Sequence, residues 1–169
     1  MPQKIRMISE FSFPAAVLHA ALVSAEYWQA RVEELDGPHA ELSIHHDDDG
    51  TLVASISKPV VTERIPPRLL RFWPSGLRLD YSEHWPPLVD GVARAEISGG
   101  IASVGSLTGI CELSDGATGC LSEYSVTVES GIPMAGKLIA GAFAKGIIED
   151  SGAVDAFTER WLRMRQERV

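Results

Sequence analysis

LRLDYSEHW, residues 77–85, is the clearest β-strand signal in this chain of 169 residues. Its side chains alternate with a period of two, which is typical of a strand with one face on the core and one toward water. The inner face would carry Tyr81, Glu83 and Trp85. The outer face is polar, with Arg78, Asp80, Ser82 and His84. Two prolines follow at once and end the strand.

A hairpin is predicted upstream of this strand, in residues 42–56. A two-residue turn would place the apolar residues of its two strands on opposite faces. A three-residue loop, residues 48–50, places Ile44 opposite Ala54 and keeps them on one face. The hydrophobic register therefore favours the longer loop, with Gly50 in a left-handed conformation.

A second hairpin is predicted in residues 104–129. A two-residue turn at Asp115-Gly116 would place two pairs opposite each other on the inner face: Cys111 with Cys120, and Leu107 with Tyr124. Buried cysteines behave as small apolar side chains, and a reducing compartment disfavours a disulfide. We therefore expect two free thiols, with a redox switch as the alternative.

Helices are predicted on both sides of the strand-rich region. Two short ones follow a first strand at residues 3–13, one beginning at Pro14 and one capped by Ser24. A long one runs from Met134 to about Gln166, and its first part, residues 134–146, is rich in glycine. Its apolar stripe comprises Leu138, Ala142, Ile147, Val154, Phe157, Trp161 and Met164.

This order of elements predicts an α+β fold. The apolar face of a sheet must pack against another layer, and only the final helix is long enough to cover it. We expect one domain, residues 1–169, in which a curved antiparallel sheet of about six to seven strands grips the C-terminal helix. Where the sheet curves away from the helix, a cavity would remain, and such cavities are natural ligand sites.

Composition and charge exclude several classes of protein. The net charge of −8 argues against nucleic acid, whose phosphates require a basic surface, and also against attraction to an anionic membrane surface. Residues 1–6 begin no signal peptide, and the apolar stretch 132–148 is shorter than a membrane span. We expect a cytoplasmic protein with no integral membrane association and no cofactor.

Metal binding is not expected either. Two cysteines provide no zinc pattern. His45 and His46 are adjacent in a predicted strand and therefore point to opposite faces. Residues 47–49 are three aspartates without the spacing of a calcium loop, so we interpret them as a solvated turn.

The chain resembles a known superfamily. Residues 13–17 (FPAAV) and 25–28 (AEYW) resemble the opening of START-like, helix-grip proteins, also called SRPBCC, which include polyketide cyclases and lipid-transfer domains. Residues 83–85 (EHW), 131–137 (GIPMAGK) and 157–162 (FTERWL) are similar to a bacterial branch of unknown function. The resemblance implies the helix-grip fold and carries over no catalytic residue.

Glu83 is the one candidate catalytic residue. A carboxylate between Tyr81 and Trp85 on an inner face would be desolvated unless it is paired, so it could serve as a general acid or base. Arg94 and Arg71 are its candidate partners. The plainer interpretation is a structural ion pair.

Further inner-face residues are candidates for ligand contact. Tyr81 and Tyr124 could anchor a ligand by their hydroxyl groups, although a buried tyrosine equally often bonds to the backbone. The complete candidate ligand-binding set is Tyr81, Glu83, Trp85, Leu107, Tyr124, Leu138 and Phe143. The large apolar residues of this set belong more often to a hydrophobic core than to a ligand-binding surface.

Three functions are compatible with these patterns. The first is a non-enzymatic binder of a small hydrophobic ligand, lipid-like or polyketide-like, with residues 134–146 as its gate. The second is an enzyme of the cyclase or dehydratase kind that uses Glu83. The third is a protein-interaction module, which the polar outer face disfavours because it offers no apolar anchor. The ligand and the oligomeric state stay open.

Overall fold

The computed structural model of the chain describes residues 2–73 and 76–169. Seven strands form one antiparallel sheet in the order β1-β7-β6-β5-β4-β3-β2. The strands are β1 (Gln3–Phe11), β2 (Glu41–His46), β3 (Leu52–Pro59), β4 (Arg78–Trp85), β5 (Ala93–Ile101), β6 (Gly105–Asp115) and β7 (Cys120–Glu129). The first strand of the chain therefore pairs with the last, and only β1 and β2 lie at edges.

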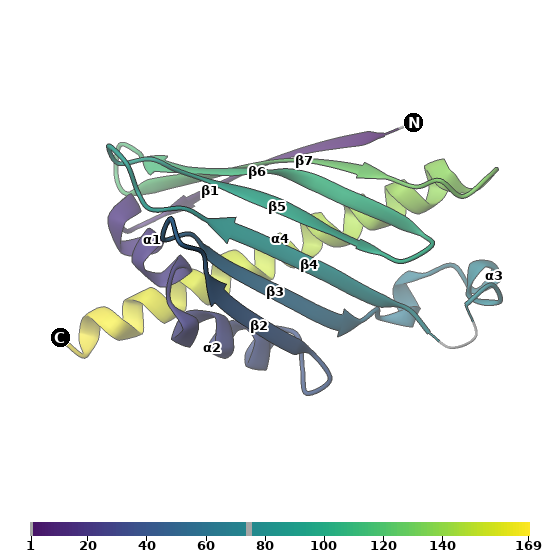
Figure 1. Ribbon diagram of the computed structural model, residues 1–169, viewed down its shortest axis with the longest axis horizontal. Helices are drawn as coiled ribbons and strands as arrows, with labels where there is room; N and C mark the ends of the chain where they lie inside the picture. The colour runs from purple at the N-terminus through teal and green to yellow at the C-terminus, as the bar shows by residue number, and fades with distance from the viewer. Residues whose placement is uncertain (1, 74–75) are drawn as a thin grey trace.

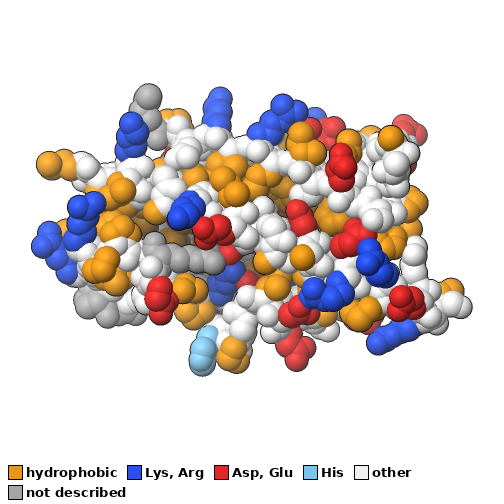
Figure 2. All heavy atoms as spheres, turned by 180° about the vertical axis from the view of Figure 1, so that it is seen from behind, with side chains coloured by type: hydrophobic (Ala, Val, Ile, Leu, Met, Phe, Trp, Pro, Cys, Tyr) orange, Lys and Arg blue, Asp and Glu red, His pale blue; other side chains and the backbone are white. Residues whose placement is uncertain are grey.

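The two helices after β1 and the long C-terminal helix lie on one side of the curved sheet (Figure 1). Two short helices follow β1 and one long helix ends the chain, as expected, so the α+β prediction is confirmed. The helices are α1 (Ala15–Leu22), α2 (Ala25–Leu35), α3 (Pro67–Leu70) and α4 (Gly136–Glu167), with a short 3-10 helix, η1 (Thr62–Arg64), before α3. The face seen from the helix side shows hydrophobic and charged side chains next to one another (Figure 2).

The first hairpin has the predicted register. Ile44 lies opposite Ala54. Residues 47–51 connect β2 to β3, and the backbone N–H of Asp47 donates to Thr51 O, which leaves residues 48–50 as the three-residue loop. Gly50 has a φ of +87°, which a side chain with a Cβ rarely adopts. Asp49 Oδ1 accepts a hydrogen bond of 2.9 Å from the backbone N–H of Thr51. The aspartates therefore form a turn, as the sequence analysis proposed.

The second hairpin differs from its prediction by four residues. Cys111 lies opposite Tyr124, and Asp115 lies opposite Cys120. Asp115 continues β6 instead of turning, because its side chain accepts a hydrogen bond of 2.8 Å from the N–H of Ala15 at the start of α1. An even shift keeps every side chain on its predicted face. The two cysteines are buried and free, and they do not face each other.

Helix α4 turns part of its predicted stripe inward, namely Ile147, Val154, Phe157 and Trp161, but not the rest. Leu138, Ala142 and Met164 are exposed, and the buried residues are Ile139, Ala140, Ala144, Phe157, Thr158 and Leu162. The prediction was wrong for the first turns because glycine and alanine give little indication of which side faces the core. The helix continues through Ser151-Gly152 without interruption.

The C-terminal half of α4 is held firmly to α2. Tyr27 is buried, and its hydroxyl lies 2.8 Å from Thr158 Oγ1. Thr158 donates its own hydrogen to Val154 O, so Tyr27 must be the donor to Thr158. Arg160 pairs with Glu34, and further along Arg165 pairs with Glu26 at 2.6 Å.

The bond from Asp115 to α1 can be tested by substitution. Pro14 precedes α1 and provides no side-chain cap, so Asp115 takes the role of an N-terminal cap from another element. We expect Asp115→Ala to lower the free energy of unfolding by about 1 kcal/mol, because it removes both an acceptor and a charge near the helix N-terminus. Asp115→Asn keeps an acceptor and should lose less. Equal losses in urea denaturation would contradict the capping role.

Candidate ligand-binding site

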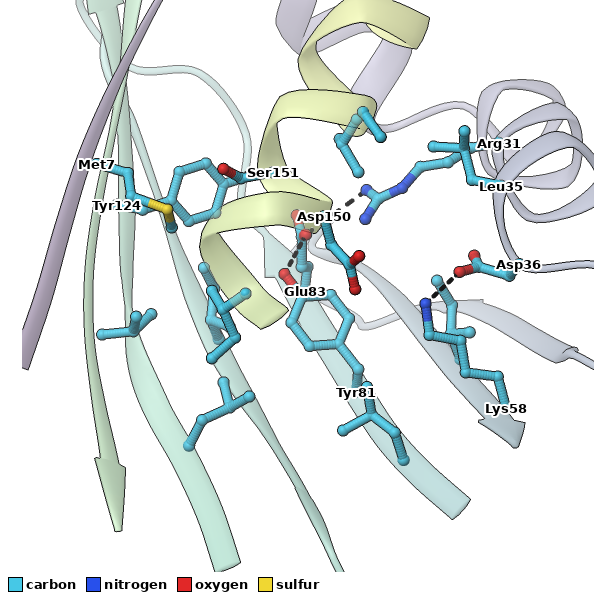
Figure 3. A pocket seen from close by; sticks show the side chains of 18 of the residues that line it. Met7, Arg31, Leu35, Asp36, Lys58, Tyr81, Glu83, Tyr124, Asp150 and Ser151 are labelled. Carbon is cyan, nitrogen blue, oxygen red and sulfur yellow. Dashed lines mark hydrogen bonds and ion pairs between the residues drawn. The ribbon is translucent and has the colours of Figure 1, made fainter. Parts of the chain in front are cut away.

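A cavity of about 320 Å³ lies between the sheet and α4. It is bordered by β1, α2, the inner faces of β3 to β7, and the middle of α4 (Figure 3). Most of its wall is apolar, and the polar groups gather near Tyr81 and Glu83. A concave, largely apolar pocket with polar groups in its wall is the usual form of a small-molecule site.

A second cavity of about 250 Å³ adjoins the first. The two share seven lining residues: Leu35, Asp36, Lys58, Leu79, Phe143, Ile147 and Asp150. Beyond this shared wall, the second cavity is lined by the segment that carries η1 and α3 and by the first turns of α4. Its own lining is apolar, including Val60, Ile65, Leu69, Trp73 and Ile139.

Glu83 is the polar centre of the first cavity. Its side chain is 1% exposed. Tyr81 donates its hydroxyl hydrogen to Oε1 at 2.5 Å, and Trp85 donates its indole N–H to Oε2 at 2.7 Å. The three residues share the inner face of β4 at a spacing of two, so the strand itself brings both donors to the carboxylate.

Arg31 supplies the opposite charge, which the sequence analysis did not foresee. Its Nη1 lies 3.7 Å from Glu83 Oε1, and its guanidinium lies over the Trp28 ring, 4.7 Å from the centroid. Burial lowers the pKa of Arg31, but the neighbouring Tyr27 and Glu83 outweigh it and the pKa rises overall. Arg31 therefore stays charged inside the cavity wall, where Figure 3 shows it pointing toward Glu83.

The partners proposed from the sequence were wrong. Arg94 pairs with Glu112 at 3.3 Å, and both side chains are largely exposed. Arg71 lies over the ring of Phe72, 4.9 Å from its centroid. One feature of the sequence could have indicated that Arg31 is buried. It lies three residues after Trp28 and four before Leu35, so it falls on the apolar stripe of α2.

One donor of Arg31 is unsatisfied. Within residues 2–73 and 76–169, its Nε is the one buried side-chain nitrogen or oxygen without a hydrogen-bond partner. A buried unpartnered N–H costs free energy until it meets an acceptor, so the wall of the cavity carries an unmet donor. An acceptor oxygen from a ligand or a water molecule would satisfy it after a small shift of the side chain.

Two tyrosine hydroxyls stay protonated in the cavity. Burial raises the pKa of Tyr81 well above its usual value, and the nearby Glu83 carboxylate adds to the effect. Burial raises the pKa of Tyr124 in the same way, with Cys111 as a further contributor. Both side chains line the cavity and act as neutral hydrogen-bonding groups rather than as bases.

Other ionisable groups border the cavity. Asp155 of α4 accepts a hydrogen bond of 2.5 Å from Ser9 of β1, and burial raises the pKa of this carboxyl. Lys58 pairs with Asp36 where the two cavities meet (Figure 3). These contacts tie α4 to β1, and the end of α2 to β3.

Burial makes the two cysteines unreactive. Burial raises the pKa of Cys111 to about 12 and that of Cys120 to about 11. Cys111 Sγ lies 3.2 Å from Ser122 Oγ. A thiol that stays protonated is a poor nucleophile, so neither cysteine is placed for chemistry.

The structure brings five of the seven candidate residues together. Those that line the first cavity are Tyr81, Glu83, Leu107, Tyr124 and Phe143. Trp85 is fully buried and acts on the cavity through its bond to Glu83. Leu138 is 44% exposed and lines neither cavity, because that face of α4 turns toward solvent.

The architecture and the cavity define a START-like, helix-grip fold. The crystal structure of the Thermus thermophilus protein TTHA0849 superimposes with a TM-score of 0.64 at 13% identity, covering 96% of this chain and 99% of that one. The Zhui aromatase/cyclase of Streptomyces sp. R1128 has a TM-score of 0.63 at 10% identity over 98% and 96% of the two chains. Ara h 8.0201 has a TM-score of 0.57 at 13% identity over 97% and 99%.

The chain belongs to the family DUF2505, described as proteins of unknown function, which it matches over residues 6–162. An uncharacterized protein of Mycobacterium tuberculosis (strain H37Rv) is 26% identical over 170 residues, covering 96% of this chain and 98% of the relative. An uncharacterized protein of Mycobacterium bovis has the same identity and coverage. Among the described residues, no helix is long and apolar enough to cross a membrane.

The Arg31–Glu83 pair is open to a direct test. Arg31→Met leaves the Glu83 carboxylate buried without an opposite charge, so we expect the free energy of unfolding to fall by about 3–5 kcal/mol. Arg94→Met removes a cation of the same kind from an exposed pair and should cost about 0–1 kcal/mol.

The double variant Arg31→Met/Glu83→Gln removes both charges and should be more stable than Arg31→Met alone. Urea denaturation measures all three. Equal losses for Arg31→Met and Arg94→Met would show that the buried pair does not hold α2 to the sheet.

Proposed function

We propose that the protein, acting as one domain over residues 1–169, binds a small hydrophobic ligand that carries one polar end. The observation that carries the proposal is the pair of adjoining cavities, one with a polar centre and one without. A ligand that spans both would place its polar end near Arg31 and Tyr81. Its apolar body would lie in the second cavity, against the side chains that include Leu69 and Ile139.

The chemistry of the polar end follows from the donors that surround it. Arg31 has an unmet N–H, and the Tyr124 hydroxyl is held protonated by burial. Both favour an acceptor oxygen, such as a carbonyl, ether or hydroxyl group. Glu83, Asp150 and Asp155 border the same space and would repel an anionic ligand. A neutral lipid-like or polyketide-like molecule fits this combination.

An enzyme of the cyclase or dehydratase kind is the second candidate. It is favoured by the position of Glu83, which lines the cavity within hydrogen-bond distance of Tyr81. The named activity of the Zhui aromatase/cyclase supports the same idea by likeness of fold alone. Binding ranks first because both oxygens of Glu83 already accept hydrogen bonds and Arg31 neutralises its charge.

Blocking the mouth of the second cavity tests ligand binding. Ala142 lines this cavity and is exposed, whereas Ala156 is exposed on the same helix and lines neither cavity. We expect Ala142→Trp to weaken binding of the neutral fluorophore N-phenyl-1-naphthylamine at least tenfold, because the indole fills the opening. Ala156→Trp should leave binding unchanged. Absence of saturable binding to the unmodified protein, by fluorescence titration, would refute the proposal.

The gate in residues 134–146 has its own test. A Cβ at Gly141 would meet only Gln3 Oε1, at 3.9 Å, and a Cβ at Gly152 would meet nothing within 4 Å. Both Gly→Ala changes therefore remove a flexible helix position without a clash, and each should raise the free energy of unfolding by about 0.5–1 kcal/mol.

Only Gly141→Ala lies within the gate. We expect it to slow release of N-phenyl-1-naphthylamine several-fold in stopped-flow measurements, whereas Gly152→Ala leaves the release rate unchanged. Equal release rates for the two variants would show that the first turns of α4 do not control exchange.

A further inference from the structure

Exposed apolar side chains lie on the two segments that line the second cavity. Val61 lines this cavity and is still 53% exposed, so the cavity opens beside it. Phe72 is 60% exposed and follows α3, next to Trp73, which lines the cavity. Met134, just before α4, and Leu138, next to the cavity-lining Ile139 in its first turn, are exposed as well. We name this set, Val61, Phe72, Met134 and Leu138, the apolar rim.

The apolar rim lies on two segments that are basic, unlike the chain as a whole. Residues 59–72 and 130–146 together contain five Lys and Arg residues and one acidic residue, Glu63, although the whole chain has a net charge of −8. Arg68 and Lys137 are exposed, and neither forms an ion pair within the described residues. In Figure 2, basic and hydrophobic side chains predominate toward the left end, while most acidic ones lie in the right half.

The end of the molecule that carries α3 and the start of α4 lies opposite the C-terminus of α4 (Figure 1). Two acidic residues at nearby strand ends, Asp80 and Glu129, are also exposed, and both belong to a separate hollow beside the β5–β6 turn. The exposed Arg68 and Lys137 therefore lie on the same two segments as the apolar rim. The net charge of −8 opposes attraction to an anionic membrane, but it is an average over the whole chain and does not describe these two segments.

We propose that the apolar rim docks on the surface of an anionic lipid bilayer. Aromatic and aliphatic side chains at such a surface enter the region between headgroups and acyl chains, while neighbouring Lys and Arg residues contact lipid phosphates. Arg71 lies over the Phe72 ring, so a cation and an apolar group would enter together. A protein partner fits less well, because it would close the mouth of the second cavity, whereas a bilayer is itself a source of hydrophobic molecules.

Docking would set the mouth of the second cavity against the bilayer. A hydrophobic ligand could then pass between the membrane and the cavity without crossing water, which is the step that its low solubility makes slow. This part of the inference rests on the proposed function. Docking itself does not, because it depends only on the rim and its charges.

Vesicle co-sedimentation tests docking. We expect the unmodified protein to bind vesicles of phosphatidylcholine mixed with phosphatidylglycerol, to bind poorly to phosphatidylcholine alone, and to dissociate as salt is raised. Arg68→Gln and Lys137→Gln should each lower the partition constant about fivefold. Phe72→Glu should lower it at least tenfold, because it removes an inserting ring and adds a repelled charge.

Val89→Glu is the matched control. Val89 is 64% exposed, lies between β4 and β5 at the other end of the sheet, and receives the same charge. It should reduce binding less than twofold. Equal effects of Phe72→Glu and Val89→Glu, or no binding to phosphatidylglycerol vesicles, would overturn the docking proposal.

Titration with N-phenyl-1-naphthylamine in the absence of vesicles distinguishes membrane docking from ligand binding. If the fluorophore binds and the vesicles do not, docking is wrong and the proposed function stands. If the vesicles bind through Phe72 and the fluorophore does not bind, docking is correct and ligand transfer is wrong.

Discussion

The buried carboxylate of Glu83 imposes the constraint on which the arrangement of sheet and helices depends. A charge so fully removed from water must be neutralised and hydrogen-bonded, or the fold loses several kcal/mol. Strand β4 supplies two of the donors by its own geometry, through Tyr81 and Trp85. The opposite charge has to come from another element, and it comes from Arg31 on α2. That requirement sets the depth and rotation at which α2 meets the sheet.

The same constraint prepares the cavity. Because Arg31, Tyr81 and Glu83 are held by one another, they do not have to be ordered when a ligand arrives. The polar centre is thus rigid, whereas the second cavity is walled by short elements and by the glycine-rich start of α4. The first cavity would therefore select the polar end of a ligand by the fixed positions of its polar groups. The second cavity would accommodate apolar bodies of different shapes.

Local patterns predicted much of the fold. Alternation along β4 and the register of the first hairpin follow from neighbouring residues, and the structure confirms both. The second hairpin was misjudged because Asp115, a good turn residue, is engaged by Ala15, one hundred residues away. No local pattern reports such a contact. The error of four residues nevertheless preserved the inner face, because it is even.

The site was predictable to the extent that it lies on strands. Tyr81, Glu83 and Tyr124 were placed correctly from period-two alternation. Arg31 was missed because a cation in a helix stripe is normally solvated, and only its distant partner on β4 explains its burial. Leu138 was misplaced because Gly136 and Gly141 carry no side chain that could mark the buried side of the helix.

The anchoring of α4 gives the molecule a mechanical asymmetry. Its C-terminal half is fastened to α2 by Thr158, Arg160 and Arg165, and Asp155 joins it to β1. Its N-terminal half packs on the core through Ile139, Ala140 and Ala144 and also borders both cavities. The helix is therefore tied by polar contacts at its C-terminal end and held by apolar packing alone beside the cavities. The gate that we propose in residues 134–146 would therefore move while the ties to α2 and β1 stay in place, so opening would not require the whole helix to detach.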